Sequence, residues 1–359
     1  MRILLCHPGA TFSVSDVHDG LARALHRRED VQVIHFALDS RIDVYARALN
    51  SAYSRYGKAN GLTKPTDLDA VYFACQGIIE RALRLQPDWV VLVTGHFFPA
   101  EFVCLLRRAR FKVAYLLTES PYEDVKEVQL LENADLAWTN ERSSARALAE
   151  AAAALGYPAR VRYLPHAFDP FVHRPGLEVP EGTPHHDVVF VGTGFIERIK
   201  LLEAVDWSGI DFGLYGAWTM MGSRSRLRRH LVEGPTANSR AVELYRAAKI
   251  GLNLYRTSVR YERETVHVTW GESLSPRALE LAACGLFQIS EYRPEVEEVF
   301  GETVPTFAGP VELERQIRRW LAATELQRSA QACAARGCVE GRGFDGMAAQ
   351  VLADLAAII

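Results

Sequence analysis

Short runs of apolar residues alternate along the chain with longer segments in which apolar residues recur every three or four positions. In the first half this pattern predicts short strands separated by amphipathic helices. The expected strands are residues 2–6, 31–38, 88–95, 112–119, 135–140 and 161–165, and the expected helices are 15–28, 66–85, 99–110 and 142–156. Such an alternation forms a parallel sheet with helices on both faces, which predicts a Rossmann-like α/β domain.

The pattern then stops and starts again. Residues 166–186 are polar, rich in proline and without periodicity, as is typical of a linker. After them, strands are expected at 187–193, 211–216, 250–255 and 286–290, and helices at 197–205, 239–249, 276–284 and 293–300, followed by two final helical patterns that end at Ile359. We therefore expect domains at 1–170 and 187–359 joined by a linker at 171–186, with the option that the last helix packs back on the first domain.

Two such domains are expected to face a cleft, with ligands bound at the carboxyl ends of the strands. The 359 residues, of which 48% are hydrophobic, suffice for two cores. A net charge of −3 gives no reason to expect nucleic acid or an anionic membrane as the main partner. No segment approaches the roughly 18 apolar residues of a membrane span, and the apolar run at the N-terminus is too short for a signal peptide. A cytoplasmic protein is expected.

The six cysteines are scattered without a CxxC spacing, so we predict reduced thiols rather than disulfides or a metal site. Asp67-Leu68-Asp69 has the spacing of a metal-binding DxD sequence. It directly follows Thr66 at an expected helix start, where acidic residues act as caps. No metal ligand is therefore predicted.

The segment "ESLSPRALELAACG", residues 272–285, carries the clearest local signals. Ser275 is a suitable N-cap, Pro276 suits the first helical position, and Gly285 can end the helix. Arg277 and Glu280 share one face of this predicted helix and point away from its apolar face. The N-terminus of a helix binds phosphate, and a carboxylate one turn further in can accept hydrogen bonds from a ribose.

This segment resembles the Glu-x7-Glu signature of retaining glycosyltransferases with the GT-B fold, in which two glutamates flank the nucleotide-sugar. Further segments resemble the CgeB-like (spore-maturation-protein) group, from about Ala134 to the C-terminus. They are "RVRYLPHAFDPFVHRP", "HDVVFVGTGFIERIKLL", "LYRAAKIGLNLYR" and "SPRALELAACGLFQIS" followed by "EVEEVFGE".

The resemblance implies a nucleotide-diphosphate-sugar donor, with a UDP-sugar favoured, held mainly by the second domain, and an acceptor on the first. It assigns Gly192, Thr193 and Gly194 to the pyrophosphate loop, and Arg198 and Lys200 to neutralising the pyrophosphate. Tyr215, Gly216 and Asn253 are assigned to the side of the nucleobase. Ser275 is assigned to the phosphate and Glu280 to the ribose. Glu272 is expected beyond the phosphates, next to the sugar.

Sugar transfer builds negative charge on the leaving diphosphate, so prearranged cations and helix N–H groups stabilise the transition state. Arg198, Lys200 and Arg277 can supply that charge without a metal. If the reaction retains configuration, as the resemblance favours, the leaving phosphate itself can take the proton of the acceptor. An inverting reaction needs a base from the first domain, and the candidates are His18, His96 and Glu119.

Three alternatives stay open: a sugar-nucleotide epimerase on the same fold, a binding protein without transfer activity, and a glycosyltransferase that acts on modified DNA. The last requires the arginine-rich segment 224–230 to face the cleft, where it could bind an anionic acceptor. Otherwise that segment is a solvated helix face. Its charged residues are Arg224, Arg226, Arg228, Arg229 and His230. The sequence leaves the acceptor open among glycans, proteins, small molecules and modified DNA.

Overall fold

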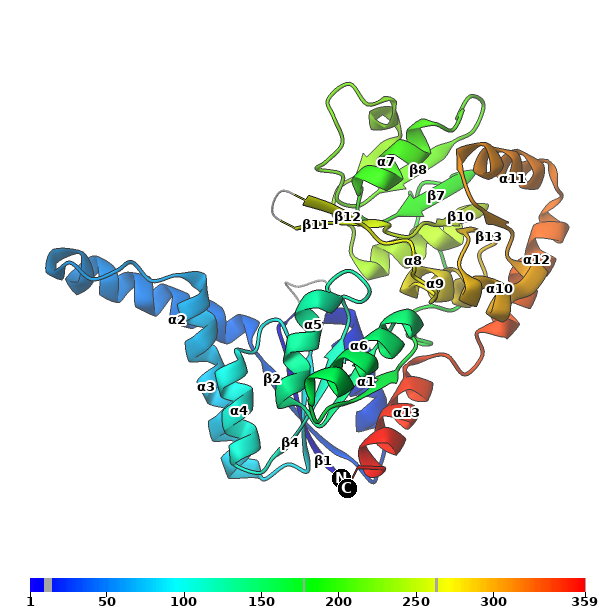
Figure 1. The fold of residues 1–359 in the computed structure, drawn as a ribbon. Coiled ribbons are helices and arrows are strands. Elements are labelled where there is room, and N and C mark those ends of the chain that lie inside the picture. Colours follow the sequence, from blue (N-terminus) through cyan, green and yellow to red (C-terminus); the bar gives the residue numbers. More distant parts are fainter. Residues whose placement is uncertain (10–14, 177, 262–263, 359) are drawn as a thin grey trace. The chain divides into compact units, whose positions relative to one another are not determined.

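The computed structural model describes residues 1–9, 15–176, 178–261 and 264–358. Figure 1 shows its helices and strands as a ribbon. The chain divides into two compact units, of which unit 1 comprises Met1–Pro165 and Met347–Ile359, and unit 2 comprises His166–Gly346. Residues 171–186, predicted as a linker, group with unit 2. Position 177 of that linker and position 359 of the last predicted helix lie outside the described residues.

Unit 1 contains a six-stranded sheet in the order β2-β1-β3-β4-β5-β6, and every neighbouring pair is parallel. The central strand β3 is buried at every position, because helices cover both faces of a parallel sheet. The strands are β1 (Arg2–His7), β2 (Gln32–Ala37), β3 (Trp89–Val93), β4 (Lys112–Leu117), β5 (Leu136–Thr139) and β6 (Arg160–Tyr163).

The helices of unit 1 include elements that the pattern did not predict. They are α1 (Ser15–His26), α2 (Asp39–Ala52), the π-helix η1 (Tyr53–Gly57), the 3₁₀-helices η2 (Lys58–Asn60) and η3 (Leu131–Asn133), α3 (Asp67–Leu85), α4 (Ala100–Arg108), α5 (Asp124–Leu130), α6 (Arg142–Leu155) and α13 (Phe344–Ala356). α13 is held on unit 1 by Asp354, which accepts a hydrogen bond from Trp138 Nε1 at 2.8 Å and pairs with Arg162 at 3.2 Å.

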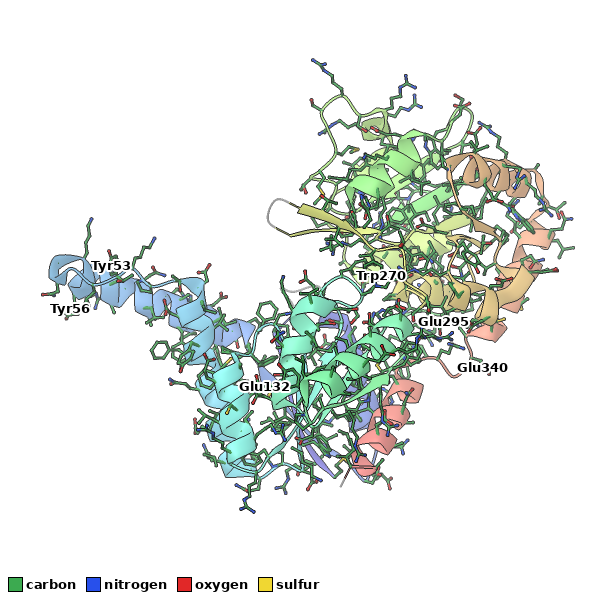
Figure 2. All side chains as sticks on the ribbon, viewed as in Figure 1. Tyr53, Tyr56, Glu132, Trp270, Glu295 and Glu340 are labelled. Atoms are coloured by element: carbon green, nitrogen blue, oxygen red, sulfur yellow. The ribbon has the colours of Figure 1, made fainter. Side chains whose placement is uncertain are left out.

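The prediction missed α2, and the reason is physical: no residue of α2 is fully buried, and Ile42, which packs against the core of unit 1, is only partly buried, so the apolar stripe of the helix is weak. α2 packs along α3 in an arm of unit 1 on which Figure 2 labels Tyr53 and Tyr56. The capping role predicted at the start of α3 is confirmed. Thr66 Oγ1 accepts from the Asp69 N–H at 3.3 Å, and the Asp69 carboxylate accepts from the Thr66 N–H at 2.7 Å.

Unit 2 contains a second six-stranded parallel sheet in the order β14-β13-β10-β7-β8-β9. Its strands are β7 (Val188–Val191), β8 (Phe212–Tyr215), β9 (Leu231–Glu233), β10 (Ile250–Asn253), β13 (Gln288–Glu291) and β14 (Thr306–Phe307). An antiparallel hairpin, β11 (Ser258–Tyr261) and β12 (Glu264–His267), lies in the polar stretch for which no strand was predicted. β7 is buried along its whole length at the centre of the sheet.

The helices of unit 2 are α7 (Ile196–Glu203), η4 (Arg226–His230), α8 (Asn238–Ala247), α9 (Pro276–Cys284), α10 (Pro294–Phe300), η5 (Gly301–Thr303), α11 (Pro310–Ala322) and α12 (Glu325–Cys338). Three helices rather than the expected two close the described chain, because Thr324 starts a new helix with a capping box to Gln327. Across the described residues, no helix has both the length and the apolar character that crossing a membrane requires.

Candidate functional site

The loop after β7 packs backbone to backbone against the loop after β8. The N–H of Gly192 donates to the Tyr215 carbonyl at 3.0 Å, and the N–H of Gly194 donates to the Ala217 carbonyl at 2.8 Å. Gly216 has a φ of +109°, and a Cβ on it would lie 2.3 Å from the Gly192 carbonyl oxygen. Only glycine fits such a position. The two loops, which carry Gly192, Thr193 and Gly194 after β7 and Gly216 after β8, are therefore tightly packed at the carboxyl ends of these strands.

Arg277 lies against this loop. It is in the first turn of α9, and a Cβ added to Gly192 would lie 2.5 Å from its Nη2 atom. The guanidinium also covers the Phe190 ring, at 4.8 Å from the ring centre. Arg277 therefore joins the glycine loop to the N-terminus of α9.

The charge of Arg277 has no carboxylate partner among the described residues, and its Nε is buried there without a hydrogen bond. If Arg277 and Glu280 only formed an ion pair with each other on the surface, neither would need a ligand. The described residues contain no such ion pair. Burial raises the pKa of the neighbouring Tyr245 above its usual range, so this neighbour is neutral at physiological pH. The loop thus holds a cation whose counter-charge the described part of the protein does not supply.

The start of α9 is anchored to the sheet, as the capping signals predict. The Ser275 hydroxyl accepts from the Ala278 N–H at 3.3 Å and donates to Asn253 Oδ1 at 2.6 Å. Asn253, fully buried at the end of β10, donates in turn to the Ser290 hydroxyl at 2.9 Å. Gly285 ends the helix with a φ of +75°. The predicted helix bounds are confirmed, and the side chain of Asn253, which the resemblance assigns to the side of the nucleobase, is bonded to Ser275 and Ser290 and so positions the helix.

Glu280 lies one turn further along α9, and its side chain is 18% exposed. Its Oε1 is 3.9 Å from Nε2 of His173. His173 Nδ1 accepts a hydrogen bond from the Asp169 N–H at 3.2 Å, so the ring proton sits on Nε2, facing Glu280. Sequence reasoning missed His173, because it lies in the stretch interpreted as a linker.

Glu272 lies on the loop before α9, and its surroundings are held firmly. Its carbonyl accepts from the Glu295 N–H at 3.0 Å, and the buried Glu295 carboxylate accepts from the Leu274 N–H at 2.7 Å. Figure 2 labels Glu295 at the start of α10. Glu295 was not predicted as a site residue, and it fixes the backbone on which Glu272 is carried.

Arg198 has a different geometry from the one expected. Its guanidinium donates to the carbonyls of Thr193 at 2.9 Å and Leu254 at 2.8 Å, and its Nε to the carbonyl of Tyr255 at 3.4 Å. The side chain is 92% buried within this cage. Arg198 therefore holds the glycine loop against the end of β10, whereas Lys200 is exposed on α7.

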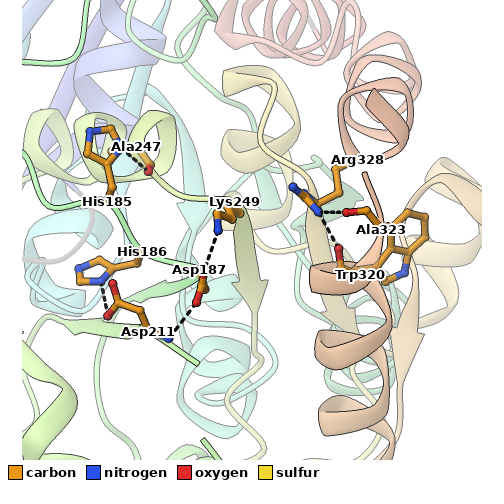
Figure 3. A network of polar contacts seen from close by, with 9 residues as sticks. All are labelled: His185, His186, Asp187, Asp211, Ala247, Lys249, Trp320, Ala323 and Arg328. Carbon is orange, nitrogen blue, oxygen red and sulfur yellow. Dashed lines mark hydrogen bonds and ion pairs between the residues drawn. The ribbon is translucent and has the colours of Figure 1, made fainter. Parts of the chain in front are cut away.

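Tyr215 contributes its backbone to the loop, but its side chain runs the other way. The hydroxyl contacts His186 Nε2 at 2.8 Å, close to where β7 begins. Figure 3 shows the polar network at this amino-terminal edge of the sheet, where Asp187 accepts from Lys249 Nζ at 2.7 Å and from the Asp211 N–H at 3.0 Å. These contacts tie the starts of β7, β8 and β10 together.

The arginine-rich segment also lies at the amino-terminal edge of this sheet. η4 and the end of α7 line a hollow of about 250 Å³. Arg226, Arg229 and His230 are among the lining residues. Within unit 2, this segment is therefore at the edge opposite the glycine loop.

In unit 1, His18 stacks on His7 with 3.5 Å between ring centres, and its Nε2 lies 3.0 Å from the Asp19 carboxylate. Burial, together with the charges of His18 and His35, lowers the pKa of His7 to about 4. His7 is therefore neutral at physiological pH. His7 is the last residue of β1, and His18 lies in the first turn of α1.

His96 follows β3, and Glu119 follows β4. His96 Nε2 lies 4.0 Å from Oε1 of Glu127, a fully buried carboxyl group whose Oε2 accepts from the Ser120 hydroxyl at 2.5 Å. Glu127 was missed because α5, which carries it, was not predicted. The only sequence signal was the density of acidic residues in "ESPYEDVKE".

Glu127 should make the stability of unit 1 depend on pH. Burial raises its pKa from 4.5 to about 8, since its charged form is poorly solvated. The stability that neutral Glu127 contributes is fully present below about pH 4.5 and is lost as the pH rises through about 8. The melting temperature of Glu127→Gln should therefore fall less between pH 5.5 and 8.5 than that of the wild type. Identical slopes in thermal melts would contradict this assignment.

Comparison with known proteins adds to this geometry. Residues 198–353 match the family model described as Glycosyl transferase-like. The chain is 24% identical over 212 residues to the spore protein CgeB of Bacillus subtilis (strain 168), a match that covers 57% of this chain and 64% of CgeB. The match spans just under two thirds of the length of that relative.

Solved structures show the fold of this chain. Sucrose-phosphate synthase from Thermosynechococcus elongatus is similar over 100% of both chains, with a TM-score of 0.64 at 14% identity. HepE of Anabaena, in complex with UDP-glucose, is similar over 99% of this chain and 100% of its own, with a TM-score of 0.62 at 13% identity. The fold is GT-B, and the predicted fold class of two Rossmann-like domains is confirmed. The Glu-x7-Glu interpretation stays a prediction.

Proposed function

We propose that the protein transfers a sugar from a nucleotide-diphosphate-sugar, with a UDP-sugar favoured, to an acceptor bound by unit 1. The observation that carries the proposal is Arg277. Its guanidinium lies against Gly192 and has no carboxylate partner among the described residues. Arg277 is half-buried, and its buried Nε has no hydrogen bond among the described residues, so an anion bound there would supply both a partner and a counter-charge. The diphosphate of the donor supplies that anion.

Charge complementarity also explains how transfer is accelerated. When the bond from the anomeric carbon to the diphosphate breaks, negative charge grows on the leaving phosphate. Arg277 and the free N–H groups at the start of α9 are already in place, so they stabilise this charge without reorganising. In this proposal Arg198 is a positioning residue that holds the glycine loop, and Lys200 adds positive charge from the exposed face of α7.

We assign the ribose to Glu280. A carboxylate with 18% of its side chain exposed and a histidine on one side has lone pairs left for two hydroxyl groups. His173 Nε2 faces one oxygen of this carboxylate at 3.9 Å. Glu272, on the firmly held loop before α9, is assigned to the sugar of the donor.

We further propose that transfer proceeds with retention and without a metal, the leaving phosphate taking the acceptor proton on the same face of the sugar. No cofactor beyond the donor is proposed. Chelation should leave the transfer rate unchanged, and NMR of the new glycosidic bond should show the anomeric configuration of the donor. The six cysteines are free thiols, which suits the cytoplasm as the location.

Nucleotide binding should appear as thermal stabilisation. UDP at about a hundredfold its dissociation constant should add roughly 2.7 kcal/mol, or several degrees in the melting temperature. Glu280→Gln should lose most of this shift, because the neutral amide is a weaker acceptor for ribose hydroxyls. GDP, CDP, TDP and ADP, run in parallel, identify the base that is preferred.

Glu243→Gln is the matched control, since Glu243 is a carboxylate of unit 2 paired with Arg240 on α8. It should keep the full shift. No shift with any nucleotide would overturn the proposal. Stabilisation by UDP with no transfer and no hydrolysis would instead indicate a binding protein, and donor turnover without an acceptor would indicate an epimerase.

A further inference from the structure

Residues 44–66 carry positive charge alone. They comprise most of α2, then η1, η2 and the chain that returns to α3. Between Asp43 and Asp67 the sequence holds no acidic residue and four basic ones, which are Arg47, Arg55, Lys58 and Lys64. We call residues 44–66 the basic arm. Outside it, the 44 acidic residues outnumber the remaining 37 of the 41 basic residues by seven, so the small net charge of the chain conceals a strong asymmetry.

The charges of the basic arm are not neutralised within the described part of the protein. All four basic side chains are exposed, and none of them pairs with a carboxylate among the described residues. Arg47 Nε donates to the Asp43 carbonyl at 3.2 Å. Arg55 and Lys58 follow Arg47 at spacings of eight and three residues, so the three share one side of the helical stretch. This side therefore attracts an external anion.

Apolar side chains are exposed beside these charges. Tyr56 is 68% exposed and Leu62 is 62% exposed. The Leu62 N–H donates to the Gly57 carbonyl at 3.0 Å, which holds Leu62 at the same end of the arm as Tyr56. Figure 2 labels Tyr53 and Tyr56 at this end. Tyrosine has an apolar ring and a polar tip, so it favours the boundary between water and an apolar phase.

The basic arm has an ordered backbone. α2, η1 and η2 follow one another without a gap from Asp39 to Asn60. Gly57 is buried against the Tyr53 ring, where a Cβ on Gly57 would lie 2.6 Å from Cδ2. The capping box of Thr66 then starts α3. A partner therefore meets a preformed surface, and binding needs little ordering of the arm.

An anionic lipid surface matches these features better than nucleic acid does. Both attract basic side chains, but a bilayer also accepts exposed apolar side chains into its interfacial region. Nucleic acid binds through phosphate contacts and base stacking, which would leave the exposed aliphatic side chains of Val44 and Leu62 in water. The combination of unpaired cations, tyrosine and leucine therefore favours the bilayer.

We propose that the basic arm docks the protein on the surface of an anionic phospholipid bilayer. Its four basic side chains lie against the headgroup phosphates, and Tyr56 and Leu62 enter the interfacial region. The rest of the chain, with its excess of acidic residues, is on balance repelled by the same surface, so contact is concentrated at the arm. This inference does not depend on the proposed function, because the arm lies outside the glycine loop and α9.

Vesicle flotation at physiological ionic strength tests the proposal. The wild type should float with vesicles of phosphatidylglycerol and phosphatidylcholine, and should not float with vesicles of phosphatidylcholine alone. The double variant Arg55→Gln, Lys58→Gln should bind about 25-fold more weakly, because each Lys or Arg near an anionic surface contributes roughly fivefold. Salt at about 1 M should release the wild type, since it screens the charges. Tyr56→Ser should weaken binding without changing its dependence on salt.

The double variant Arg224→Gln, Arg226→Gln is the matched control. It removes two exposed arginines from the arginine-rich segment of unit 2, where acidic Glu203 and Asp206 line the same hollow. It should float like the wild type. Every substitution is at an exposed position, so the melting temperatures and the UDP shift should stay those of the wild type.

Three results would each overturn the inference: no flotation of the wild type, equal flotation with neutral vesicles, or equal losses in the arm variant and its control. A gel shift with double-stranded DNA that the arm variant loses, without flotation of the wild type, would assign the arm to nucleic acid instead. A dimer in light scattering that the arm variant dissociates, again without flotation, would assign it to a second copy of the chain.

Discussion

Replacing Arg277 by glutamine should lower the transfer rate by about 100- to 1000-fold, the usual cost of losing one preorganised group that stabilises transition-state charge. Glutamine keeps a polar, hydrogen-bonding end group but is shorter than arginine and removes the positive charge next to Gly192. Because the charge on the leaving phosphate grows during the reaction, the loss should be larger in kcat than in the affinity for UDP. Steady-state kinetics with UDP-glucose, alongside thermal shifts with UDP, measures both quantities.

Arg226→Gln is the matched control for Arg277→Gln. It removes the same charge from unit 2, but Arg226 lines the hollow beside η4 at the opposite edge of the sheet. Its kinetics should match those of the wild type at physiological ionic strength. Equal losses in the two variants would show that net charge, rather than the place of Arg277, governs the rate.

The start of α9 could be predicted from the sequence because its signals are local. Ser275 caps the helix, Pro276 occupies the first position, and Gly285 ends it, so each residue performs its role within a few positions of its neighbours. The six strands of the first sheet and β7, β8, β10 and β13 of the second were predictable for a similar reason, since strands covered on both faces are continuous apolar runs. The short strands β9 and β14 at the two edges of the second sheet were not predicted.

The contacts between segments distant in sequence could not be read in the same way. His173 contacts Glu280 across more than a hundred residues of chain, and Arg198 donates to the carbonyls of Leu254 and Tyr255. From the sequence alone, the guanidinium of Arg198 is available to bind a phosphate. The fold shows that this guanidinium already donates hydrogen bonds to backbone carbonyls. Glu127 was equally hidden, because nothing in its own segment distinguishes a buried glutamate from an exposed one.

Replacing Gly216 by alanine should destabilise unit 2 by at least about 2 kcal/mol, because the new methyl group meets backbone rather than a movable side chain. Its Cβ would lie 2.3 Å from the carbonyl oxygen of Gly192 at a φ of +109°, so the two loops must separate. Thermal melts should show the loss of stability. Since that movement takes Gly192 away from Arg277, the shift produced by UDP should shrink as well.

Gly222→Ala is the control for this substitution, since a Cβ there meets nothing within 4 Å and its φ is not in the positive range. It should keep both the stability and the UDP shift of the wild type. A Gly216→Ala variant that melts early yet keeps the full UDP shift would separate the two roles of the loop. In that case the contact between the loops would serve folding alone, and Arg277 would bind the diphosphate without help from Gly192.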